Sequence, residues 1–170
     1  MDAVLARLMS TTNAAIFNAL VAEYQSNETR MSFRRGRAKV QDAFPVICVE
    51  MMSRAEPWGA TSHTKDIKID LNIYAMIRIL GGNTGDRIAQ KVEDYIVELG
   101  ETLQAILNER GQLQYKDIDG NGMCIYDSYA ETASYETVYN GAVRQVKMPW
   151  FGKLWLFSGS PTVPGGGFST

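Results

Sequence analysis

The stretch DIKIDLNIYAMIRI, residues 66–79, decides the fold of this chain. Apolar side chains occupy its odd positions from Ile67 to Ile79, and mostly polar ones occupy the even positions from Lys68 to Arg78. Successive side chains of a β-strand point to opposite faces of the sheet, so this alternation predicts one long strand with its odd face on a core. The even face is mixed in character, and the pattern leaves open whether it meets solvent or a partner.

Shorter strand signals flank this stretch on both sides. FPVICVEMM, residues 44–52, is an apolar run with a proline near its start, which is typical of a largely buried strand. Further along the chain, residues 113–118 and 123–130 alternate over short lengths. Residues 135–150 predict a long strand, which 150–157 either extend or follow as a strand of their own.

Two helices are expected, one near the N-terminus and one in the middle of the chain. Apolar side chains recur at helical spacing through residues 3–24 and again through roughly 86–109. Gly100 interrupts the second helix at a cost of about 1 kcal/mol relative to alanine, and Gly111 ends it. Helices set apart from a run of neighbouring strands indicate an α+β fold. We expect a mostly antiparallel sheet, with an N-terminal helix and one long central helix packed on one face.

The composition suits one globular domain. The chain has 170 residues, of which 45% are hydrophobic and 21% are charged, so it can bury a sizeable core. We expect a single domain over residues 1–157, including a basic loop at 30–43. Residues 158–170 are rich in glycine, proline and serine, which predicts a flexible C-terminal tail.

Charge and hydropathy argue against several classes of protein. The net charge of −2 provides no overall basic footprint for nucleic acid. No run of about 20 apolar residues is present to span a membrane, and the first residues lack the apolar core of a secretory signal. Cys48 and Cys124 lie in apolar, strand-like runs, which indicates reduced core thiols in a cytoplasmic setting.

The stretch DIDGNGMCIYDS, which begins at Asp117, resembles a calcium-binding loop. Asp117, Asp119, Asn121 and Gly122 match the first, third, fifth and sixth positions of an EF-hand loop, but Ser128 replaces the carboxylate at the twelfth. An EF-hand also needs a helix on each side, whereas strand patterns flank this loop. We therefore interpret it as a tight turn between two strands, with no metal or cofactor expected; weak, adventitious cation binding is the alternative.

Two other features bear on catalysis and on anion binding. GGNTGD, residues 81–86, places two glycines before a helix, but it lacks the lysine and the spacing of a phosphate-binding loop. His63 is the single histidine, and no serine elbow or activated cysteine motif accompanies it. We expect a strand–helix connection and a solvated loop histidine, hence no enzyme; a hydrolase built around His63 is the alternative.

Two clusters are candidate interfaces. Five basic residues fall within residues 30–39, a segment without apolar periodicity that predicts a mobile or extended loop able to contact an acidic partner or DNA phosphates. Four aromatic residues, Trp150, Phe151, Trp155 and Phe157, fall within eight residues and combine core character with that of a subunit interface. The candidate interface residues are Arg30, Arg34, Arg35, Arg37, Lys39, Trp150, Phe151 and Trp155.

The layout from residue 44 to about 157 resembles the phage tail terminator proteins, the lambda-type tail-completion family. The resemblance is one of element pattern rather than of invariant residues, and it covers about two thirds of the chain. Two departures are the long basic loop before the first strand and the extension after Phe157. The resemblance rests on FPVICVE, KDIKIDLNIYAMI, DRIAQKVEDYIVELGETLQAIL and ETVYNGAVRQVKMPWFGKLWL.

This resemblance implies a structural viral protein without catalytic activity or cofactor. It would form a ring, usually hexameric, that caps the tail tube, stops its polymerisation and joins the tail to the neck of the head. The ring would be located at the tail–neck junction of a virion that is assembled in the host cytoplasm. Partners would be further copies of the chain, the tube protein, neck proteins and a sheath where one exists, with DNA only in transit. A neck or head-completion connector is the alternative; ring stoichiometry, tail contractility and the tube-facing surface stay open.

The calcium-loop alternative predicts a measurable difference. Replacing Asp117 and Asp119 together by asparagine should leave bound calcium at background and the unfolding temperature unchanged, because a turn needs no metal. Inductively coupled plasma mass spectrometry, after both proteins are equilibrated with calcium, measures the bound calcium and checks this expectation. A stoichiometric calcium in the wild type that the double variant loses would establish the calcium loop instead.

Overall fold

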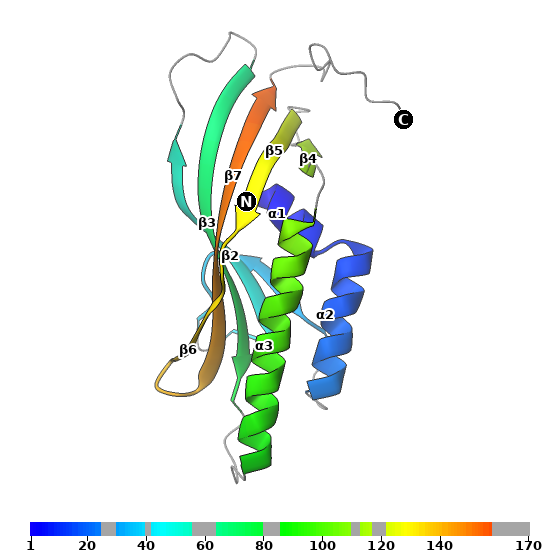
Figure 1. The fold of residues 1–170 in the computed structure, drawn as a ribbon, viewed down its shortest axis with the longest axis vertical. Helices are drawn as coiled ribbons and strands as arrows, with labels where there is room; N and C mark the ends of the chain where they lie inside the picture. The colour runs from blue at the N-terminus through cyan, green and yellow to red at the C-terminus, as the bar shows by residue number, and fades with distance from the viewer. Residues whose placement is uncertain are drawn as a thin grey trace.

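The chain folds as helices over one face of a twisted, mostly antiparallel β-sheet (Figure 1). The expected α+β class is therefore confirmed. This computed structural model describes residues 1–24, 30–39, 42–55, 64–79, 86–109, 113–116 and 122–157. The expected tail at 158–170, His63 and the loop residues Asp117 to Asn121 lie outside the described residues.

The sheet has the strand order β1-β2-β3-β7-β5-β4, and β6 pairs with β7 beyond the end of β5. β1 runs parallel to β2, and all other pairs are antiparallel. The elements in chain order are α1 (Asp2–Leu8), α2 (Thr11–Tyr24), β1 (Ser32–Arg35), β2 (Val46–Ala55), β3 (Thr64–Arg78), α3 (Asp86–Asn108), β4 (Leu113–Lys116), β5 (Gly122–Ala130), β6 (Ser134–Val138) and β7 (Val143–Phe157).

The central pair of the sheet is β3 and β7, whose 15 residues each are paired from Thr64 with Phe157 to Arg78 with Val143. The odd positions of β3 from Ile67 to Ile77 are all buried, as the alternation predicts. They form the main core with the inner faces of α2 and α3 and with Trp150 of β7. Figure 1 shows β3 and β7 continuing past the C-terminal end of α3.

The even face of β3 is divided into two halves. Asn72, Tyr74 and Met76 are buried there, although the sequence pattern left this face open to solvent or a partner. Tyr74 and Met76 belong to a second apolar cluster, which also contains Ala38 and Phe44 from the segment between β1 and β2. Nearer the start of β3, Lys68 is exposed on the same face. The segment between β1 and β2 therefore covers the half of the even face around Tyr74 and leaves the half around Lys68 uncovered.

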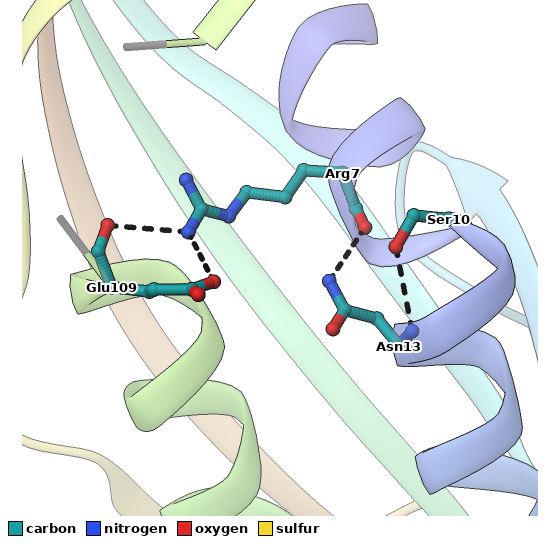
Figure 2. Close-up of polar contacts among 4 residues, drawn as sticks. All are labelled: Arg7, Ser10, Asn13 and Glu109. Carbon is teal, nitrogen blue, oxygen red and sulfur yellow. Dashed lines mark hydrogen bonds and ion pairs between the residues drawn. The ribbon is translucent and has the colours of Figure 1, made fainter. Parts of the chain in front are cut away.

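The N-terminal helix predicted over residues 3–24 is two helices, α1 and α2, which meet at an angle of 62°. Ser10 causes the break, because its hydroxyl accepts a hydrogen bond from the Asn13 backbone N–H at 3.4 Å, as in an N-cap (Figure 2). The Asn13 side chain donates to the Arg7 carbonyl at 2.9 Å, so the end of α1 is satisfied as well. Arg7 in turn reaches the last turn of α3 and donates to Glu109 Oε2 at 2.8 Å.

The prediction of one long strand over residues 135–150 was also wrong, because two strands, β6 and β7, share this stretch. β6 ends at Val138, and β7 begins at Val143. Between them Tyr139, Asn140 and Gly141 all have positive φ, at 54°, 54° and 86°. Asn-Gly is a strong hairpin signal because both residues tolerate this backbone conformation, and it reverses the chain here. Residues 150–157 extend β7 rather than form their own strand.

The basic segment contains a strand where a loop was predicted. β1 pairs in parallel with β2, from Ser32 beside Val46 to Arg35 beside Val49. Phe33 anchors this strand edge-on against Phe17 of α2, with the ring centroids 5.9 Å apart. The prediction missed β1 because four residues are too short to show a period, and the pairing is supplied by a partner strand.

The predicted turn between two strands at Asp117 is consistent with the pairing on either side. β4 and β5 pair antiparallel from Leu113 with Ile125 to Lys116 with Gly122. The strands on both sides of the loop also exclude the flanking helices that an EF-hand requires.

Two glycines of the core should respond oppositely to alanine. A Cβ on Gly152 would lie 2.2 Å from the buried ring of Trp150, which covers this position and has no room to move. Gly152→Ala should therefore lower the free energy of unfolding by about 1–3 kcal/mol, measured by urea denaturation.

Gly100→Ala is the matched control. Its Cβ would meet the hydroxyl of Tyr135 at 2.7 Å, but Tyr135 is 38% exposed and its ring can swing outward. Alanine also favours the helix by about 1 kcal/mol, so stability should be unchanged or slightly raised. Equal losses in both variants would contradict the argument that Trp150 fixes Gly152.

Candidate interaction surface

Three of the five basic candidates are engaged within the subunit. Arg34 pairs with Asp42, which lies in the segment that follows β1. Arg35 Nε lies 2.8 Å from Asp2 Oδ1 of α1, although without a well-aligned hydrogen bond. The Arg37 guanidinium sits over the ring of Tyr74 at 5.1 Å from its centroid. These arginines therefore attach β1 and the segment after it to the rest of the fold.

Arg37 also joins a polar network on the covered half of the even sheet face. It donates to Gln145 Oε1 at 3.4 Å, and the fully buried Gln145 donates to Glu136 at 2.5 Å. The Tyr74 hydroxyl donates to Glu50 at 3.0 Å. Burial, and next the hydrogen bond to Glu50, raise the pKa of Tyr74, which stays neutral. The network satisfies polar groups that the covering segment removes from water.

Arg30 and Lys39 remain for contact with another molecule. Both are exposed, and among the described residues neither side chain has a hydrogen bond or an ion pair. Arg35 retains 63% exposure of its side chain beside Asp2. The part of the basic segment that can meet a partner is therefore smaller than the sequence indicates.

The aromatic candidates separate in the same way. Trp150 is 1% exposed and lies in the main core, which removes it from the interface candidates. Its neighbour Phe151 points to the opposite sheet face and is 38% exposed. The side chain of Trp155 lies outside the described residues, although its backbone belongs to β7.

A hollow on the uncovered half of the even sheet face brings Phe151 together with residues that were not candidates from the sequence. Its volume is about 280 Å³. Phe151 of β7 lies opposite Tyr129 of β5 in the strand register, and Tyr129 is 56% exposed, so two aromatic residues line this hollow. We call this surface the open half-face; it comprises Lys68, Asp70, Asp127, Tyr129, Phe151 and Lys153.

The charges of the open half-face are unevenly paired. Lys153 Nζ lies 2.7 Å from Asp127 Oδ2, and Asp70 accepts a hydrogen bond from the hydroxyl of Ser53. Lys68 stands directly opposite Lys153 in the β3–β7 register and has no ion pair among the described residues. Like charges directly opposite each other on a sheet are unfavourable. The alternation of residues 66–79 locates Lys68 and Asp70, but only the strand pairing brings Tyr129 and Phe151 beside them.

The described residues contain no group of three or more histidine, cysteine, aspartate or glutamate side chains placed to hold a metal ion. Cys48 is buried, and that burial raises the pKa of its thiol to about 11. A buried thiol of this kind is unreactive at neutral pH. In the part of the chain that is described, no single helix is long and apolar enough to cross a membrane.

The comparisons with known proteins leave the surface to be interpreted from its own chemistry. No protein-family model matches the chain, and a search of curated proteins found no similar sequence.

Reversing the charge of Arg37 should destabilise the subunit itself. Glutamate at this position loses the contact with Tyr74 and adds a carboxylate to a network that already contains Glu50 and Glu136. Because the Arg37 side chain is exposed, we expect Arg37→Glu to lower the free energy of unfolding by about 1 kcal/mol, which lowers the melting temperature by about 2–4 °C.

Arg30→Glu provides the control, because it makes the same charge change at an exposed side chain without a described contact. Its stability should stay within about 0.5 kcal/mol of the wild type. Thermal unfolding followed by circular dichroism compares the two variants, and equal melting temperatures would refute the role given to Arg37.

Proposed function

We propose that this chain is a structural virion subunit, a tail terminator that assembles into a ring at the end of the tail tube. The ring stops polymerisation of the tube and joins the tail to the neck of the head. The resemblance of residues 44–157 to the tail terminator family supplies the class, and the open half-face supplies the physical support.

The open half-face is the observation that carries the proposal. A sheet with helices on one face normally leaves its other face polar and solvated. Here Tyr129 and Phe151 are exposed in the middle of that face, with charges of both signs around them. Aromatic residues surrounded by a polar rim are typical of protein–protein contacts. The surface therefore suits assembly with another protein.

The length of the central strands supports an assembly role as well. At about 3.3 Å per residue, the 15 residues of β3 and β7 span roughly 50 Å. A subunit built on such a long pair offers an extended flank to its neighbours, and repeated contact between two different flanks closes a ring when the rotation permits.

The exposed basic residues are assigned to a partner other than the ring itself. Arg30, Arg35 and Lys39 lie on or next to the edge strand β1, remote in the strand order from Tyr129 on β5. A tube or neck protein with an acidic surface would fit them. DNA passes through such a ring only in transit, which agrees with a chain of net charge −2 that has no overall attraction for phosphates.

Electron microscopy and native mass spectrometry of the purified chain test the proposal. We expect closed rings of one defined stoichiometry, alone or at one end of tail tubes isolated from the virus that encodes the chain. Adding the chain during tube assembly should stop elongation. Rings bound to isolated heads rather than to tubes would favour the neck-connector alternative. Monomers in every sample, with tubes that elongate freely, would overturn the proposal.

A further inference from the structure

We infer that successive copies of this chain contact each other head to tail, with the outer face of α3 of one copy seated on the open half-face of the next. This inference rests on the proposed ring and specifies the two surfaces that form it. Its evidence comes from charge and shape on two separate parts of the subunit.

The first surface is an acidic stripe along α3. Val97 and Glu98 each lie three or four residues from both Asp94 and Glu101, so all four residues share one side of the helix. The side of α3 that meets the core is opposite, at Tyr95, Ile96, Leu99 and Leu103. We call Asp94, Val97, Glu98 and Glu101 the acidic stripe.

Three acidic residues on or just after α3 already have partners inside the subunit. Glu93 pairs with Arg144 at 2.7 Å, and Glu109 pairs with Arg7 at 2.8 Å. Glu98 accepts a hydrogen bond from Tyr24, which raises the pKa of that tyrosine to about 12. Asp94 and Glu101 are exposed and have no hydrogen bond or ion pair among the described residues. They flank Val97, an apolar side chain that is 41% exposed.

The second surface is the open half-face, which is complementary to the acidic stripe in each of these respects. Among the described residues Lys68 has no ion pair, and it lies opposite Lys153, so a carboxylate from another molecule would offset the repulsion between the two. The hollow of about 280 Å³ beside Tyr129 and Phe151 can receive a side chain of the size of valine. A helix with carboxylates on either side of Val97 therefore fits a hollow with the exposed Lys68 at its rim.

The two surfaces belong to opposite layers of the subunit. α3 packs on the odd face of the sheet, and the open half-face is on the even face. One copy cannot bring its own stripe to its own half-face, so the contact must join two copies. Because the contacting surfaces differ, the contact is heterologous, and its repetition gives a closed ring or an open filament.

Charge exchange between two variants tests the contact. The face variant is Lys68→Glu, and the stripe variant combines Asp94→Lys with Glu101→Lys; all three side chains are exposed, so both variants should keep the wild-type circular dichroism and melting temperature. Each variant alone should self-associate at least about tenfold more weakly than the wild type in analytical ultracentrifugation, since like charges then face each other.

An equimolar mixture of the two variants should recover association. In an assembly where the two variants alternate, the wild-type stripe of the face variant meets the wild-type half-face of the stripe variant. At the next contact the basic stripe of the stripe variant meets the glutamate that Lys68→Glu introduces, so opposite charges face each other again. Glu23→Lys is the control, with the same kind of charge change at an exposed position elsewhere, and it should associate like the wild type.

Three outcomes overturn the inference. A wild-type chain that stays monomeric without tubes, a stripe variant that associates normally, or a mixture that fails to recover would each exclude this contact. Loss with Lys68→Glu alone would point instead to a symmetric contact between two open half-faces. Rings on tail tubes in any of these cases would show that the proposed function survives without this contact, and their absence would show that both fail.

Discussion

The pairing of β3 with β7 is the constraint on which the rest of the structure depends. Fifteen consecutive residue pairs join the two strands without an interruption in register. A shift of one residue would exchange the two faces of β3 and expose its buried isoleucines. Because β2 pairs with β3, and β5 and β6 pair with β7, the position of almost every other strand follows from this register.

The two faces produced by this register have different roles. The odd face is covered by α2 and α3 and forms the main core. Part of the even face is covered by the segment after β1, which brings Ala38 and Phe44 over Tyr74 and Met76. Arg34 and Arg37 hold that segment in place, so residues that the sequence marks as a docking loop are largely structural. The uncovered part of the even face is the open half-face, which is the surface proposed for contact with another subunit.

Several local features follow from the close packing of this two-layer fold. Trp150 covers Gly152 on the same strand, so the large ring and the missing side chain fill one space. Tyr24 stacks on Tyr95 with ring centroids 4.9 Å apart, which fixes α2 beside α3. Arg7 connects α1 to the end of α3 through Glu109, where a cation is favourable beside the last carbonyl groups of a helix. Apart from Trp150, none of the residues in these contacts was singled out from the sequence.

The sequence by itself determined the elements with long and regular periods. The alternation of residues 66–79 was sufficient to predict β3 and its core face, and the helical spacing of 86–109 was sufficient to predict α3, because each pattern extends over several repeats. Short signals were missed or misread: the N-cap at Ser10, the Asn140-Gly141 turn and the four-residue β1 depend on one or two residues each. Only the tertiary structure decided which of the candidate interface residues reach solvent. Trp150 and Phe151 are neighbours in the chain, but strand geometry sends one into the core and the other to the surface. Likewise, Tyr129 and Lys68 become parts of one surface only through the pairing of β5 and β3 with β7, since a surface is a property of strands brought together and not of any single one.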